Sequence, residues 1–130
     1  MPRTVGSAWS WGATEKETHA PEEIFVHHIE ALEAGDIEGI MLDYRDDACL
    51  ITPSGLLRGK DAIRGFFSAL LEILPHPVFD VSTCFVDDLL FVEWNATSAK
   101  HTISEGVDTF IFKDGQIRAH TASFRLHSNS

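Results

Sequence analysis

Apolar residues recur at helical spacing in three segments of the N-terminal half of the chain. The first segment begins at Pro21, followed by two glutamates as helix starts favour, and ends at Gly35. The second begins after Asp36, a good N-cap residue, and the third runs from about Asp61 to Leu74. The three stripes are Ile24, Phe25, Ile29 and Leu32; Ile37, Ile40, Met41 and Tyr44; and Ile63, Phe66, Phe67, Leu70, Leu71 and Leu74.

The rest of the chain favours strands, with a period-two alternation that is clearest at Val92, Trp94 and Ala96. The expected strands are 48–52, 56–58, 78–86, 89–99, 104–113 and 116–126. Three helices followed by a run of antiparallel strands predict an α+β domain in which one face of the sheet packs against the helices. The domain is expected over residues 21–130, after an arm of residues 1–20.

The arm carries Trp9 and Trp11 among polar and small residues, and two interpretations stay open. It is either a flexible terminus or a segment that docks on the domain, over a pocket mouth or a partner subunit.

Composition excludes several classes of partner and site. With 20 acidic against 10 basic residues the formal net charge is −10, which repels nucleic acid and anionic membranes, so neither is expected. No apolar run is long enough to span a membrane and no secretion signal opens the chain, so a cytoplasmic location is expected. Cys49 and Cys84 lack CxxC spacing, and no histidine spacing or glycine loop indicates a metal, phosphate or cofactor.

Four runs of the sequence together resemble a known superfamily. They are AGDIEGI at 34–40, DDACLITP at 46–53, GKDAIRGFF at 59–67 and GVDTFIFKDGQI at 106–117. In this order they resemble the nuclear-transport-factor-2-like superfamily, in the style of its SnoaL-like polyketide cyclases and ketosteroid isomerases. The resemblance covers roughly residues 22–126. It implies a cone in which a curved sheet and the helices enclose an apolar pocket, and it implies homodimers that usually form through the sheet.

Ketosteroid isomerases use a carboxylate base, and a tyrosine and a protonated aspartic acid stabilise the enolate oxygen. Carried over by motif, the protonated acid falls on Asp108, the base on Thr52 and the tyrosine on His28. A supporting tyrosine falls on Phe67. Because threonine cannot accept an α-proton at neutral pH, we reject steroid isomerisation by this machinery.

Two related machineries are also incomplete. The SnoaL-like cyclases use an aspartate on the last strand, two residues after a frequent histidine. That histidine resembles His120, but the aspartate position is occupied by Ala122. Related epoxide hydrolases use an Arg–Asp pair on the strand of Asp108, and the arginine position is Gly106. The resemblance therefore leaves His120, Asp108 and His28 as the candidate catalytic residues.

Each candidate has a structural alternative. His28 lies on the apolar stripe of the first helix, whereas His27 is expected to point elsewhere. The alternative for His28 is a core histidine that is hydrogen-bonded to a backbone carbonyl. The alternative for Asp108 is an aspartate on a solvated strand face, and for His120 it is a surface position.

The register of the Asp114–Gly115 hairpin decides whether Asp108 meets His120. A two-residue turn pairs Asp108 with Thr121 and puts His120 on the opposite face. A three-residue turn pairs Asp108 with His120 and turns His120 inward, which is the register that the family resemblance favours. In that register Asp108 could orient His120, and His120 could act as a general base.

The remaining pocket wall is expected to be aromatic and apolar, which suits a small, flat, apolar or aromatic ligand. The expected lining residues are Tyr44, Thr52, Phe66, Phe67, Val92, Trp94 and Phe124. The same side chains could equally fill a core.

The sequence supports three hypotheses. The first is a cofactor-independent enzyme of the isomerase, cyclase or dehydratase (lyase) type that moves protons on an apolar substrate. In this hypothesis His120 is the base, Asp108 orients it or is a neutral donor, and His28 is a second donor. The second is a module that binds a hydrophobic metabolite without transforming it. The third is a structural dimerisation domain.

Overall fold

The structure, a computed structural model, describes residues 19–129. Trp9 and Trp11 lie outside the described residues. The elements are α2 (Pro21–Ala34), α3 (Ile37–Leu42), β1 (Tyr44–Thr52), β2 (Gly55–Arg58), α4 (Lys60–Ile73), β3 (Val78–Val86), β4 (Leu89–Thr97), β5 (His101–Lys113) and β6 (Gln116–Ser128). The α+β class is confirmed.

The helix ends follow from local chemistry. Before α2, the Ala20 N–H donates to Glu23 Oε1 at 2.9 Å, and after it Gly35 adopts a left-handed conformation with φ 71°. Asp36 caps α3, because its Oδ1 accepts a hydrogen bond from the Gly39 N–H at 3.0 Å. This helix ends before Tyr44, which was expected on its inner face and is instead the first residue of β1.

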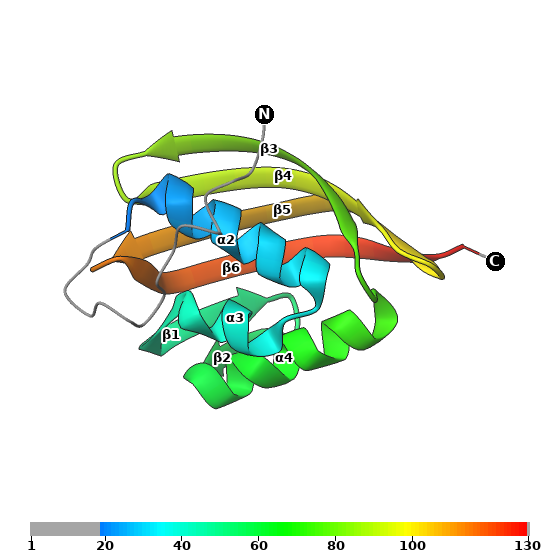
Figure 1. The fold of residues 1–130 in the computed structure, drawn as a ribbon, viewed down its shortest axis with the longest axis horizontal. Coiled ribbons are helices and arrows are strands. Elements are labelled where there is room, and N and C mark those ends of the chain that lie inside the picture. Colours follow the sequence, from blue (N-terminus) through cyan, green and yellow to red (C-terminus); the bar gives the residue numbers. More distant parts are fainter. Residues whose placement is uncertain (1–18, 130) are drawn as a thin grey trace.

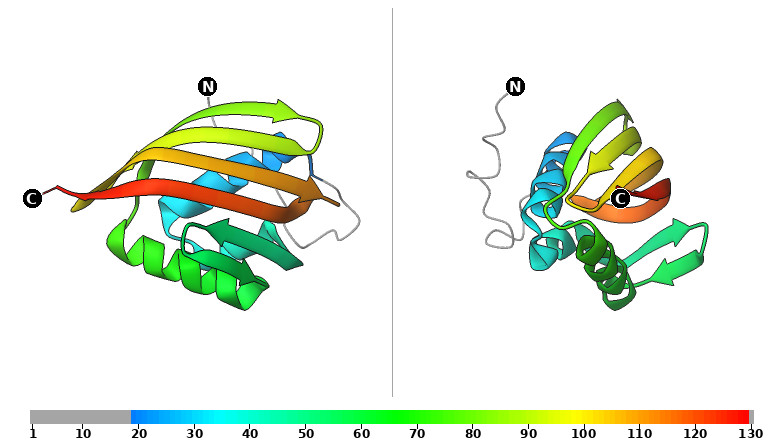
Figure 2. Two further views of the ribbon diagram at one scale, coloured as in Figure 1. Left: turned by 180° about the vertical axis from the view of Figure 1, so that it is seen from behind. Right: turned by 90° about the vertical axis from the view of Figure 1, so that its right-hand side faces the viewer.

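The strands form a six-stranded sheet in the order β2-β1-β6-β5-β4-β3. Only the β1–β6 pair within it is parallel, so the sheet is mixed. The sheet is curved and unclosed, and all three described helices lie along its concave face (Figures 1 and 2). The core lies between these two layers and includes Ile24, Leu50, Ile63, Leu90, Ile103 and Ile117, each at most 1% exposed. Burying one such side chain contributes about 1.5–3 kcal/mol.

The two faces of the sheet differ because side chains alternate along each strand. In β4 the even-numbered residues are buried under the helices and the odd-numbered ones are exposed. Exposed apolar side chains on the outer face include Val86, Leu89, Phe91, Val107 and Ile111. The expectation of a homodimer through this face stays a prediction.

The β5–β6 hairpin combines a two-residue turn with a bulge. Asp114 and Gly115 have φ 54° and 78°, as a type I′ turn requires, and Lys113 pairs with Gln116. The register then shifts by one residue at Arg118, which pairs with nothing on β5. Both expected pairings of Asp108 were therefore wrong, since it pairs with Ala122.

The bulge nevertheless turns His120 inward, as the family resemblance favoured. Phe110 is the residue opposite His120, and Asp108 is its diagonal neighbour. A two-residue turn without the bulge would have exposed His120 on the outer face.

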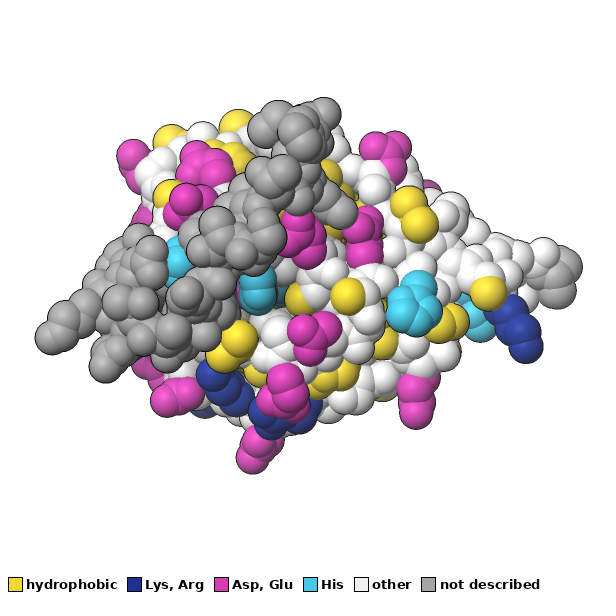
Figure 3. All heavy atoms as spheres, in the orientation of Figure 1, with side chains coloured by type: hydrophobic (Ala, Val, Ile, Leu, Met, Phe, Trp, Pro, Cys, Tyr) yellow, Lys and Arg dark blue, Asp and Glu magenta, His cyan; other side chains and the backbone are white. Residues whose placement is uncertain are grey.

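Acidic side chains are spread over the face of the molecule drawn in Figure 3, in keeping with the net charge of −10. Within residues 19–129, no helix is both long enough and apolar enough to cross a bilayer.

Candidate active site

A small cavity lies between the helices and the concave face of the sheet. The lining residues that carry polar groups are His28 from α2, Asp108 from β5, His120 from β6 and Trp94 from β4. The apolar lining includes Phe66, Phe67, Val92, Phe110, Ala122 and Phe124. The cavity volume is about 40 Å³, which is room for water molecules but far below the roughly 300 Å³ of a typical ligand site. A ligand of that size would have to displace side chains of the cavity wall, in which Phe66 and Phe124 are partly exposed.

Four buried polar side chains form one hydrogen-bonded chain along the sheet side of the cavity. Asp108 Oδ2 lies 2.7 Å from His120 Nε2, and Asp108 Oδ1 accepts from the Trp94 indole N–H at 2.8 Å. The other ring nitrogen of His120, Nδ1, lies 2.8 Å from the Tyr44 hydroxyl. Phe110 stacks on the His120 ring with centroids 4.0 Å apart, which fixes the plane of the imidazole. The chain thus runs Trp94–Asp108–His120–Tyr44.

The environment keeps His120 neutral. Burial lowers the pKa of His120, and it outweighs the opposing hydrogen bond and negative charge of Asp108. Burial also raises the pKa of Tyr44 well above its usual value, with the charges of Asp43 and Asp108 adding to the effect, so Tyr44 keeps its proton. Tyr44 therefore donates to His120 Nδ1, and His120 Nε2–H donates to the Asp108 carboxylate.

Gly106 explains how the Trp94 indole reaches Asp108. Trp94 pairs with Gly106 across the β4–β5 ladder, and its ring lies directly over that glycine. A Cβ at position 106 would lie 2.4 Å from Trp94 Cε2, closer than any side chain tolerates. The sequence comparison showed only that Gly106 occupies the arginine position of related epoxide hydrolases. In the structure, the absence of a side chain at Gly106 makes room for the Trp94 ring, whose N–H donates to Asp108.

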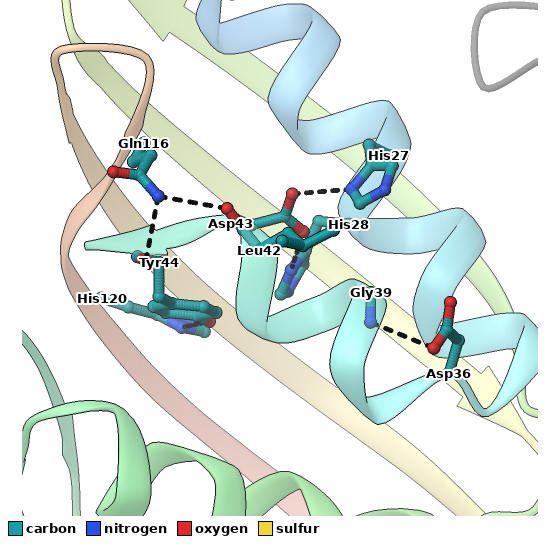
Figure 4. Close-up of polar contacts among 9 residues, drawn as sticks. All are labelled: His27, His28, Asp36, Gly39, Leu42, Asp43, Tyr44, Gln116 and His120. Atoms are coloured by element: carbon teal, nitrogen blue, oxygen red, sulfur yellow. Dashed lines mark hydrogen bonds and ion pairs between the residues drawn. The ribbon is translucent and has the colours of Figure 1, made fainter. Parts of the chain in front are cut away.

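A second cluster, which the sequence reasoning missed, lies on the helix side of the cavity. Asp43, fully buried at the end of α3, has Oδ2 3.3 Å from His28 Nδ1 and Oδ1 2.6 Å from His27 Nδ1 (Figure 4). Adjacent helix residues diverge by about 100°, but the two carboxylate oxygens of Asp43 reach both rings. His27 therefore does not point elsewhere as expected, and His28 binds a carboxylate rather than a backbone carbonyl. An aspartate after a six-residue helix gives no sequence signal of burial.

Two expected lining residues lie outside the cavity wall. Thr52 is at the end of β1, where its Oγ1 accepts from the Ser54 N–H at 3.1 Å, and it does not line the cavity. Tyr44 lies behind His120, which it contacts through its hydroxyl group and its ring, and it does not line the cavity. Phe66, Phe67, Val92, Trp94 and Phe124 all lie in the wall, as do the three candidate catalytic residues. No cluster of His, Cys, Asp and Glu in the described part of the chain is arranged to hold a metal ion.

The family model of the SnoaL-like domain matches residues 25–120. The chain belongs to the SnoaL-like family. A search of curated protein sequences gave no significant match.

Solved structures of similar fold agree with this SnoaL-like assignment. Wild-type IdmH, a proposed polyketide cyclase from Streptomyces antibioticus, is 17% identical with a TM-score of 0.65, over 85% of this chain and 93% of that one. A SnoaL-like protein from Burkholderia thailandensis E264 is 20% identical with a TM-score of 0.67, over 81% and 94%. AclR, a proposed hydroxylase from Streptomyces galilaeus, is 13% identical with a TM-score of 0.68, over 81% and 88%. At these identities the likeness shows the fold.

The ion pair of His27 with Asp43 makes one prediction about this SnoaL-like domain. Burial opposes a charge on His27, but the hydrogen bond and charge of Asp43, with Glu30 and Asp36, raise its pKa above the usual 6.5. Stabilisation by His27 is therefore complete below pH 6.5 and is lost as the pH rises through the raised pKa. We expect His27→Gln to lower the free energy of unfolding by about 1–2 kcal/mol near pH 6 and by less near pH 9.

Urea denaturation at the two pH values measures this difference. His127→Gln is the matched control, because His127 is exposed and its partner is the Ser104 hydroxyl. An equal loss for His27→Gln at both pH values would contradict the ion pair.

Proposed function

We propose that the protein is a cofactor-independent enzyme that moves protons on a small apolar or aromatic substrate, in a reaction of the isomerase, cyclase or dehydratase type. One observation carries the proposal, namely the Asp108–His120 pair at the polar side of an otherwise apolar cavity. A substrate that fills the cavity leaves no room for water between its apolar walls, so a carboxylate there would act on the substrate without competing solvent. Titratable groups in such surroundings are typical of acid–base sites.

The geometry favours Asp108 over His120 as the base. Both ring nitrogens of neutral His120 are occupied, one by the Tyr44 hydroxyl and the other by Asp108. His120 therefore orients Asp108, which reverses the roles expected from the sequence. Each oxygen of Asp108 accepts one hydrogen bond and keeps a further acceptor position, and Asp108 lines the cavity. A proton from a carbon next to a carbonyl would move to Asp108, leaving its electron pair on the substrate as an enolate.

Deuterium exchange tests the proposal without knowledge of the natural substrate. A panel of small apolar ketones, 1,3-diketones and aromatic analogues is incubated with the protein in D₂O and followed by mass spectrometry. We expect at least one compound to gain deuterium, or to isomerise, faster than without protein. A panel in which compounds bind but none gains deuterium or isomerises would favour the binding module. A panel in which none binds or exchanges would contradict the proposal.

A further inference from the structure

Asp43 is a buried carboxylate to which the proposed chemistry at Asp108 assigns no role. It is fully buried, and the only side chains of the described chain that bond its carboxylate are His27 and His28. Burying a charge costs several kcal/mol unless the charge is paired. Apolar side chains would fill the same space without that cost, so a carboxylate with two histidines suggests a role other than packing. Figure 4 shows both rings turned toward Asp43 from α2.

The contact with Asp43 selects one tautomer of His28. A carboxylate only accepts hydrogen bonds, so the proton of the His28 ring lies on Nδ1, 3.3 Å from Asp43 Oδ2. The other nitrogen, Nε2, then carries a lone pair. Within residues 19–129 that nitrogen has no hydrogen-bond partner, although the His28 side chain is only 3% exposed. His28 lines the cavity, whereas Asp43 lies behind it.

We propose that Asp43 is a positioning residue, which holds His28 with a bare Nε2 and so makes His28 a second proton acceptor in the cavity. The proposal rests on the proposed function. It replaces the donor role expected for His28 from the sequence, since a neutral ring with its proton on Nδ1 has no N–H to offer at Nε2. It also places one acceptor on each side of the cavity, with Asp108 on the sheet and His28 on α2.

His27 completes the cluster. Its ring is 16% exposed and its Nδ1 lies 2.6 Å from Asp43 Oδ1, so it can carry the positive charge that balances the carboxylate. The Asp43 carboxylate therefore has a cationic partner other than His28, and the hydrogen bond at His28 Nδ1 leaves the lone pair on Nε2. The His28 ring also meets Tyr44, Phe67, Phe110 and His120 edge-on, at centroid distances of 5.6–6.3 Å, which leaves it little freedom to turn.

The proton step balances within the site. A proton leaves an O–H or C–H group of the substrate for His28 Nε2, and the bonding electron pair stays on the substrate. The resulting imidazolium is stabilised by its Nδ1–H bond to the Asp43 carboxylate. The imidazolium returns the proton to the product, which restores neutral His28.

Nitrogen-15 NMR of the histidine rings tests the tautomer without any substrate. At pH 7 we expect the wild-type His28 ring with its proton on Nδ1 and a bare Nε2. Free histidine prefers the proton on Nε2, so this result requires an acceptor at Nδ1. A wild-type His28 with the proton on Nε2 would overturn the proposal, whether or not the protein is an enzyme.

Asp43→Asn supplies the activity measurement, with Asp46→Asn as control because Asp46 is 98% exposed. In the deuterium assay we expect Asp43→Asn to lower kcat about a hundredfold with KM little changed, and Asp46→Asn to match the wild type. Wild-type rates in a folded Asp43→Asn variant would contradict the positioning role. If no compound exchanges even with the wild type, the proposed function fails, and the tautomer measurement still decides the geometry at Asp43.

Discussion

Asp108→Asn is expected to lower the rate of deuterium exchange by about a hundredfold or more, the usual contribution of a general base. Asparagine cannot take a proton from the substrate at neutral pH. It also has one acceptor oxygen where Asp108 has two, so it can satisfy either the Trp94 indole N–H or His120 Nε2–H but not both. The donor left without a partner should lower the free energy of unfolding by about 1–3 kcal/mol.

Asp80→Asn makes the same chemical change at an exposed aspartate of β3 and should leave both quantities unchanged. The rate is measured by mass spectrometry and the stability by urea denaturation. An Asp108→Asn variant that keeps the wild-type exchange rate would exclude Asp108 as the base.

Gly106→Ala should destabilise the fold by about 1–3 kcal/mol, as overpacking of a buried site does. Its Cβ would lie 2.4–2.6 Å from three atoms of the Trp94 ring, and a ring packed against Phe79 and Phe124 cannot move aside as a flexible chain end would. Displacing the indole also breaks its hydrogen bond to Asp108, so exchange activity should fall together with stability.

Gly65→Ala is the matched control. Gly65 is exposed inside α4 and nothing lies within 4 Å of its added Cβ, so the alanine should stabilise the helix by about 0.5–1 kcal/mol. Denaturation curves of the two variants should therefore move in opposite directions. A Gly106→Ala variant as stable as the wild type would mean that Trp94 does not lie over Gly106.

The sequence predicts most of the framework because local patterns determine it. The stripe from Ile24 to Leu32 with its stop at Gly35, and the stripe that was expected to end at Leu74, locate two helices within a residue. Tyr44 was misplaced because a helical stripe and a following strand can share an apolar residue, and only the tertiary fold decides where the helix ends.

The site was less accessible to sequence reasoning because it depends on register and on contacts between distant elements. The Asp114–Gly115 turn was visible, but the bulge at Arg118, which turns His120 inward, carries no glycine or proline to mark it. Likewise, Asp43 meets His28 across 15 positions of sequence, and its burial follows from how α2 packs on α3.

The protonation state of His120 tests the role of Asp108 as the base most directly, because that role depends on a neutral His120 ring bonded at both nitrogens. Nitrogen-15 NMR of the wild-type protein measures it during titration from pH 8 downward. We predict a neutral ring with its proton on Nε2, which stays neutral as the pH falls through the ordinary histidine pKa of about 6.5. A His120 ring that is positively charged at pH 7, or that carries its single proton on Nδ1, would contradict the role of Asp108 as the base.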